Sequence, residues 1–129
     1  MIVDTSALIA ILRQEDDAEM LSEALDKAGK ISVSAATWFE SAIVADRFRD
    51  PTIPRRFDTL CHEMNLAIVS LDESQARIAR AAYRDFGKGS GHKAQLNFGD
   101  CFAYALAKTL NEPLLYKGTD FRHTDVRSA

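Results

Sequence analysis

Four acidic residues lie at positions where the sequence predicts partial or full burial of their carboxylates, which costs free energy unless another group stabilises the charge. Asp4 ends a short apolar segment, and Asp120 lies in a Gly-Thr-Asp turn that follows another. Glu40 and Asp100 lie in stretches of helical spacing, with mostly apolar residues three and four positions away. A buried carboxylate needs hydrogen bonds, a counter-ion or a metal ion. If the four groups meet, a divalent cation would relieve their repulsion, and all-oxygen ligands favour Mg²⁺ or Mn²⁺ over zinc.

Each of these acids also has a purely structural interpretation, and spacing alone leaves both open. Asp4 fits the N-cap of the helix that follows it, and Asp120 fits an Asx turn. Asp100 fits a capping box that begins at Asn97. Glu40 lies near the middle of its helix, where the alternative is a partly exposed acid at the edge of an apolar stripe.

The elements that must position these acids alternate between strand and helix. We predict strands at residues 2–3, 31–34, 66–71 and 114–117, and helices at about 7–12, 18–28, 35–49, 55–65, 73–86 and 98–110. This alternation favours an α/β fold with a central parallel sheet of four or five strands and helices on both faces. The segment at 66–71 is apolar enough to be buried on both faces of such a sheet. Carboxylates at the carboxyl ends of parallel strands would then share one crevice.

Composition excludes several classes of protein. With 129 residues, 47% of them hydrophobic and 27% charged, the chain fits one globular domain, residues 1–129, rather than a disordered or fibrous protein. The formal charge of −3 argues against a protein that coats nucleic acid. Cys61 and Cys101 form no C-x-x-C motif, so neither a disulfide scaffold nor a zinc ribbon is indicated. No signal-peptide pattern and no membrane-length apolar run is present, which predicts a cytoplasmic protein.

Four motifs in this chain resemble those of the PIN-domain family, specifically VapC-type toxins of bacterial type II toxin–antitoxin systems. The motifs are IVDTSAL at the N-terminus, TWFESAIV around Glu40, NFGDCFAYALA around Asp100 and KGTDFRHTDV around Asp120. The resemblance covers essentially the whole chain, with the motifs in the family's order. It implies a three-layer PIN-like domain and a Mg²⁺-dependent endoribonuclease. It also implies a homodimer and a VapB-like antitoxin that blocks the active site.

The resemblance assigns roles to individual residues. The family's acidic metal and catalytic site falls on Asp4, Glu40, Asp100 and Asp120. We expect Asp4 and Asp100 to bind the ion directly, and the other two acids to act through water, complete a second ion site or orient the nucleophile. Ser6 matches a supporting hydroxyl residue of the family. Asp125 resembles an additional family acid and fits a turn residue equally well.

Basic residues must lie near such a site if RNA is to approach it. From residue 80 to the C-terminus the chain has eight Lys and Arg against five acids. The candidates for phosphate contact are Lys88 and Lys93 in the glycine-rich loop, with Lys117 and Arg122 beside the Asp120 turn. Ordinary solvated surface charge remains the alternative for each of them.

Three other functions compete with the ribonuclease interpretation. A phosphohydrolase of the haloacid dehalogenase type needs a second Asp two residues after the first, where this chain has Ser6. A receiver-like Mg²⁺-binding domain needs paired acids and an acceptor Asp, and its only candidate, Asp72, reads as a helix cap. A PIN-fold binding or regulatory module without nuclease activity would predict losses among the four acids, and none is lost.

Overall fold

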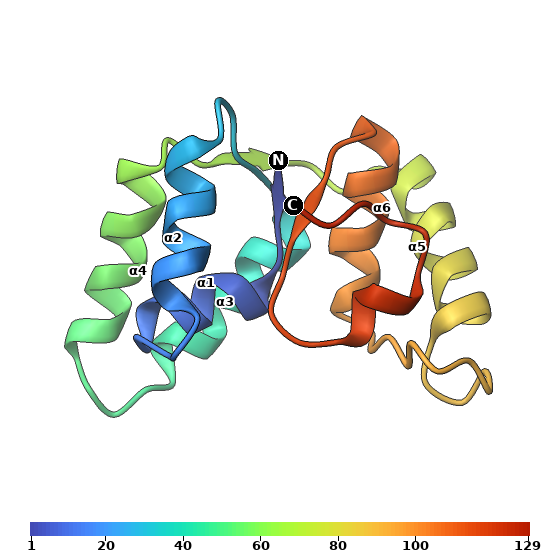
Figure 1. Cartoon of the computed structure of the whole chain (residues 1–129), viewed down its shortest axis with the longest axis horizontal. Coiled ribbons are helices and arrows are strands. Elements are labelled where there is room, and N and C mark those ends of the chain that lie inside the picture. The colour runs from blue at the N-terminus through green and yellow to red at the C-terminus, as the bar shows by residue number, and fades with distance from the viewer.

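A parallel sheet separates two groups of helices in the computed structural model, which describes all of residues 1–129 (Figure 1). The strands are β1 (Ile2–Val3), β2 (Ser32–Ser34), β3 (Ala67–Val69) and β4 (Leu114–Leu115). Their order across the sheet is β3-β2-β1-β4, and each neighbouring pair is parallel. The predicted α/β fold with a central parallel sheet is confirmed, with four strands.

Six α-helices and one short 3-10 helix connect the strands and cover the sheet. They are α1 (Thr5–Leu12), α2 (Ala18–Lys27), α3 (Ala35–Asp46), α4 (Thr52–Glu63), α5 (Glu73–Phe86), α6 (Asp100–Leu110) and η1 (Asp120–His123). In Figure 1, α1 to α4 lie on one side of the strands and α5 and α6 on the other. Helices therefore cover both faces, as the alternation of elements predicts.

Side chains that alternate along the strands divide the core into two clusters. Ile2 and Leu114 point into the cluster that α5 and α6 complete. Val3, Val33 and Leu115 point to the opposite face, into the cluster formed with α1, α2 and α4. Successive strand residues point to opposite faces, so each short strand anchors both layers. This double anchoring fixes where the chain leaves the sheet, and hence where the acids after β1 and β4 lie.

The connection between α3 and α4 differs from its prediction. The helix predicted to run to about residue 49 ends at Asp46, and the next helix begins at Thr52 rather than at residue 55. The Asp50 carboxylate accepts hydrogen bonds from the Thr52 backbone N–H at 2.9 Å and from the Thr52 hydroxyl at 2.7 Å. Pro51 therefore stands at the start of α4, where its missing N–H costs nothing.

Other predicted ends are displaced by one to a few residues. The strand predicted at 114–117 ends at Leu115, and the helix predicted from 98 begins at Asp100. The helix at 73–86 matches its prediction, and Asp72 caps it by accepting a hydrogen bond from the Gln75 N–H at 2.8 Å. The receiver-like role considered for Asp72 is therefore less favoured than the cap.

The prediction that residues 66–71 are buried on both faces was wrong. Only residues 67–69 form a strand, β3, and it lies at the edge of the sheet, where Ile68 is 51% exposed. The opposite edge differs, because the C-terminal segment covers β4. There Leu114 donates its N–H to the Arg127 carbonyl at 2.8 Å, and the Ala129 N–H donates to the Leu114 carbonyl at 3.0 Å. One edge of the sheet is thus covered and the other is open.

None of the helices has the length and apolar character needed to cross a membrane.

Candidate active site

A pocket of about 330 Å³ gathers the four acids that the sequence singled out. Asp4 follows β1, Glu40 lies in α3, Asp100 begins α6 and Asp120 begins η1, and all four line the pocket. The pocket lies beyond the carboxyl ends of β1 and β4, the expected place for a ligand site in a parallel sheet. The predicted convergence of these carboxylates in one crevice is therefore what the structure contains.

Asp4 is held at the base of the pocket and is only 3% exposed. It is the N-cap of α1, and its Oδ2 accepts hydrogen bonds from the Ser6 N–H at 3.0 Å and from the Ser6 hydroxyl at 2.6 Å. The Ser6 Oγ in turn accepts a hydrogen bond from the Lys117 backbone N–H at 3.0 Å. Burial raises the pKa of Asp4, and the nearby Glu40 carboxylate raises it further. Ser6 therefore links the first acid to the loop that leads to Asp120.

Glu40 is fixed from two sides. The Thr5 hydroxyl donates a hydrogen bond to Glu40 Oε1 at 2.6 Å, and the Ser41 hydroxyl lies 3.0 Å from the Thr5 oxygen. The other oxygen, Oε2, lies so close to Gly99 that a Cβ at this position would overlap it. Glycine at residue 99 is what allows α3 and the start of α6 to approach this closely.

Asp100 is both a helix cap and a pocket acid. Its Oδ2 accepts a hydrogen bond from the Asn97 N–H at 2.9 Å, and its own N–H donates to Asn97 Oδ1 at 2.9 Å. Burial raises the pKa of Asp100 to about 6, and the charges of Asp4, Asp120 and Glu40 add to this effect. The capping box predicted with Asn97 is present, and it leaves Oδ1 of Asp100 without a hydrogen bond.

Asp120 differs from the other three acids because its carboxylate accepts no hydrogen bond from the protein. It begins η1, a single 3-10 turn that the buried side chain of Phe121 anchors to the core. The Asx turn considered from the sequence is therefore absent at this residue. Its side chain is the one pocket carboxylate with both oxygens free of hydrogen bonds from the protein.

The four carboxylates are not neutralised by basic side chains. Lys117 is the only basic residue in the pocket lining, and its ammonium is paired with Glu15 and, at 3.1 Å, with Asp17. These two acids, at the turn between α1 and α2, raise the pKa of Lys117 by hydrogen bonding to it. Lys117 thus ties that turn to the loop after β4, and its charge is already shared with these two acids.

The donor set fits a small divalent cation. The available ligands are carboxylate oxygens, which are hard donors, and their mutual repulsion is the cost that a cation would offset. No group of three His, Cys, Asp or Glu side chains stands in position to hold one ion together. Mg²⁺ usually binds through one or two carboxylates and keeps several waters, so a direct pair of ligands suffices for it.

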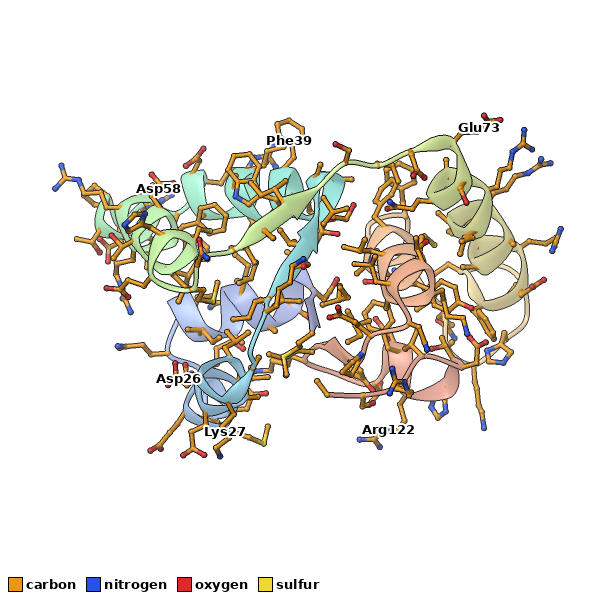
Figure 2. All side chains as sticks on the ribbon, turned by 90° about the horizontal axis from the view of Figure 1, so that it is seen from above. Asp26, Lys27, Phe39, Asp58, Glu73 and Arg122 are labelled. Carbon is orange, nitrogen blue, oxygen red and sulfur yellow. The ribbon has the colours of Figure 1, made fainter.

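The remaining predicted residues lie outside this pocket. Asp125 accepts hydrogen bonds from the Tyr104 hydroxyl at 2.7 Å and from Lys108 Nζ at 2.9 Å, and the Tyr104 contact is the main reason its pKa is lowered. It is therefore a structural partner of α6. Lys88 and Lys93 are exposed on the loop between α5 and α6. Arg122 is exposed on η1, two residues from Asp120, and its side chain extends away from the ribbon (Figure 2).

An aromatic surface adjoins the acidic pocket, and sequence reasoning did not identify Phe98 and Phe102 as part of it. A groove of about 400 Å³ runs from Glu40 past Phe39, Phe98 and Phe102, and a second of about 530 Å³ continues between α5 and α6. Phe39 and Phe98 are 61% and 76% exposed, and Figure 2 shows Phe39 standing out from α3.

Sequence reasoning also missed Thr5. The signal that could have found it is its place between two predicted site residues, Asp4 and Ser6.

The parallel sheet and its carboxylate pocket define a class of α/β protein that holds acidic residues at the carboxyl ends of its strands. The family model described as PIN domain matches residues 1–127. Ribonuclease VapC28 of Mycobacterium tuberculosis is 57% identical over 129 residues, which are all of this chain and 97% of that relative. The chain therefore belongs to the PIN domain family, and within it to the VapC-type proteins, as its motifs predict.

Solved structures share the fold at low sequence identity. Mycobacterium tuberculosis VapC20, a sarcin-ricin loop cleaving toxin, has a TM-score of 0.76 at 11% identity, covering 99% of this chain and 97% of that chain. A toxin-antitoxin complex from Klebsiella pneumoniae has a TM-score of 0.71 at 19% identity, covering 96% and 92%. At these identities the likeness establishes the fold.

Proposed function

We propose that this protein is a Mg²⁺-dependent endoribonuclease, with Mn²⁺ able to substitute, and that it is the toxin of a toxin–antitoxin pair. The observation that carries the proposal is that four carboxylates, with no basic side chain to neutralise them, meet in one pocket: Asp4, Glu40, Asp100 and Asp120. The 57% identity to a relative named ribonuclease supports RNA as the substrate. Hydrolysis of RNA in the cell would stop translation and growth.

The proposed roles of the acids follow from how each is held. Bound Mg²⁺ supplies an activated water and polarises the phosphodiester. Asp4 and Asp100 bind it directly in this proposal, because both are fixed by hydrogen bonds to backbone N–H groups. Glu40 acts through a water. Asp120, which has no hydrogen bond to the protein, accepts one from the attacking water and orients it towards phosphorus.

The substrate would reach the pocket along the side of η1 and the loop between α5 and α6. Lys88, Lys93 and Arg122 are exposed there and are free to pair with phosphates. Lys117 contacts a phosphate in this proposal only if it leaves Glu15 and Asp17, so we assign it a smaller share of RNA binding than the other three.

The proposed partners are a VapB-like antitoxin that blocks the pocket and a second copy of this chain. A structural neighbour that is itself a toxin-antitoxin complex supports the antitoxin. Exposed Phe39 and Phe98 line one groove beside the pocket and support a homodimer, because a contiguous patch of exposed apolar side chains marks a site of protein–protein interaction. Sedimentation of wild type and Phe98→Ser tests this. A monomeric wild type at micromolar concentration contradicts the homodimer.

The test of the proposed function compares wild type, Asp100→Asn and Asp58→Asn. Asn at position 100 keeps an acceptor for the Asn97 N–H and removes the charge. Asp58 is an exposed acid on α4, outside the pocket, and serves as the matched control (Figure 2). Each protein is induced in a host without the antitoxin, and total RNA is then examined. We expect growth arrest and discrete RNA cuts with wild type and Asp58→Asn only.

Purified wild type should then cut the affected RNA with Mg²⁺ and lose this activity in a chelator. If Asp100→Asn arrests growth as strongly as wild type and no RNA is cut, the acids are not catalytic. A PIN-fold binding module would then replace the ribonuclease proposal.

A further inference from the structure

Three pocket carboxylates share one pattern of hydrogen bonding. In each, the protein bonds to one oxygen and not to the other. The bonded oxygens are Asp4 Oδ2, held by Ser6, Glu40 Oε1, held by Thr5, and Asp100 Oδ2, held by Asn97. Each of these groups therefore has one oxygen left for a ligand in the pocket.

Thr5 is the least expected member of this set. Its hydroxyl proton goes to Glu40 Oε1, since this carboxylate oxygen is the nearest acceptor at 2.6 Å, whereas the carbonyl of residue 37 is 3.4 Å away. Ser41 is fully buried, and its hydroxyl lies 2.8 Å from the Thr37 carbonyl oxygen and 3.0 Å from the Thr5 oxygen, either of which can accept its single proton. The contacts form a short chain of hydroxyls that ends on Glu40.

Gly99 confines the same carboxylate from the opposite side. Glu40 Oε2 lies where a Cβ of residue 99 would stand, so any side chain at this position would displace it. The backbone of Gly99 is helical, with φ of −64° and ψ of −39°, so alanine is compatible with this backbone. Steric exclusion of the Glu40 oxygen is therefore what distinguishes glycine from alanine here.

We propose that Thr5 is a positioning residue for Glu40, and that its hydroxyl, together with Gly99, leaves this carboxylate a single oxygen with which to hold a water of a bound divalent cation. The inference rests on the proposed metal site. Single carboxylate oxygens and water suit Mg²⁺, which requires near-ideal octahedral geometry, whereas Ca²⁺ readily takes both oxygens of one carboxylate. Thr5 thus contributes to the choice of ion as well as to its affinity.

The test is calorimetric titration of the RNA-free protein with Mg²⁺ and, separately, with Ca²⁺. Thr5→Val has nearly the same shape and lacks the hydroxyl. We expect it to weaken Mg²⁺ binding about tenfold, the usual scale for groups that orient metal ligands, and to weaken Ca²⁺ binding less. Thr5→Ser restores the hydroxyl and should return the Mg²⁺ affinity to within about threefold of wild type.

Two further variants separate positioning from general damage. Thr37→Val removes a buried hydroxyl of α3 that has no hydrogen-bond partner, so Mg²⁺ affinity should be unchanged. Gly99→Ala displaces the Glu40 oxygen without touching Thr5, and should weaken Mg²⁺ binding as Thr5→Val does. Circular dichroism and thermal melting establish that each variant is folded.

The proposal is overturned if folded Thr5→Val binds Mg²⁺ within twofold of wild type, if Thr5→Ser fails to restore binding, or if wild type binds neither Mg²⁺ nor Mn²⁺ at millimolar concentration. If folded Thr5→Val cannot be obtained, the Mg²⁺ affinities of Gly99→Ala and Thr5→Ser decide. Affinity that is unchanged in Gly99→Ala, or strongly weakened in Thr5→Ser, overturns the proposal. A wild type that binds Mg²⁺ with this dependence on Thr5 but cuts no RNA would remove the ribonuclease proposal and leave the positioning role intact.

Discussion

Three of the pocket acids differ from the fourth in how the protein holds them. Asp4 caps α1, Glu40 and Asp100 lie on α3 and α6, and each accepts at least one hydrogen bond that fixes one of its oxygens. Asp120 stands on a 3-10 turn of four residues and accepts none. The difference indicates a division of labour in which three groups are pre-arranged to bind, while the fourth can still adapt to substrate and water.

The energetic cost of the pocket falls mainly on the acids that are held. Burial raises the pKa of both Asp4 and Asp100, and each also feels the charge of Glu40. Hydrogen bonds from Ser6 and Asn97 offset part of this cost without removing it, because both pKa values remain raised. The held acids should therefore respond most strongly to mutation and to pH, and this comparison can be tested from its largest effect to its smallest.

The largest effect is expected from removing a held carboxylate. Asp4→Asn should reduce RNA cleavage about 1000-fold, since it removes several kcal/mol of interaction with the proposed ion, and each tenfold in rate is about 1.4 kcal/mol. Single-turnover cleavage at saturating Mg²⁺ measures this effect. A loss of less than tenfold would remove Asp4 from the direct ligands.

A smaller effect is expected at the acid that is not held. Asp120→Asn should reduce cleavage by about 10- to 100-fold and leave Mg²⁺ affinity within about threefold, because Asp120 acts on water in our proposal. Calorimetry and cleavage rates on the same preparation separate the two quantities. If Mg²⁺ affinity falls as far as it does in Asp4→Asn, this result contradicts the proposal that Asp120 acts on water while the acids held by hydrogen bonds bind the ion.

The third effect is the pH dependence of metal binding. The pKa of Asp100 is raised to about 6, so protons compete with the ion below this value. Mg²⁺ affinity should be nearly constant above pH 7 and fall by up to about tenfold per pH unit below 6. Calorimetry between pH 5 and pH 8 measures it. The fall should be weaker in Asp100→Asn, which lacks this titration, and an identical profile would contradict the assignment.

The smallest effect concerns the stability of the metal-free protein. Asp100 has a folded pKa of about 6 against its usual 3.8, so the folded chain retains a proton that the unfolded chain has lost. The free energy of unfolding therefore falls as pH rises between these values, and the charged group costs stability at pH 7. Asp100→Asn should gain about 1 kcal/mol at pH 7, a figure reduced for partial exposure, and almost nothing at pH 3.5. Thermal or urea unfolding in a chelator at both pH values measures this gain.

The sequence predicts those features of the fold and site that depend on local pattern. Asp72 caps α5 as predicted, because a cap is read from neighbouring residues. The four acids converge as predicted: the parallel strands bring Asp4 and Asp120 to one edge of the sheet, and α3 and α6 bring Glu40 and Asp100 to it. Burial of residues 66–71 was predicted wrongly, since apolar content does not tell whether a strand is central or at an edge.

Features that depend on contacts between distant segments lie beyond such prediction. Lys117 lies about a hundred residues from Glu15, with which it pairs, so the sequence presents it as a free basic side chain. Thr5 and Glu40 meet only because α1 and α3 pack together. The need for glycine at residue 99 likewise comes from the approach of α3, which no local pattern records.

The unequal edges of the sheet have a consequence for association. β4 is covered by the chain's own C-terminal segment, whereas β3 pairs only with β2 and leaves Ile68 half-exposed. Another extended chain can therefore pair with this sheet only at its β3 edge. With three residues, β3 offers few backbone hydrogen bonds to such a chain, and this shortness protects the protein against edge-to-edge aggregation.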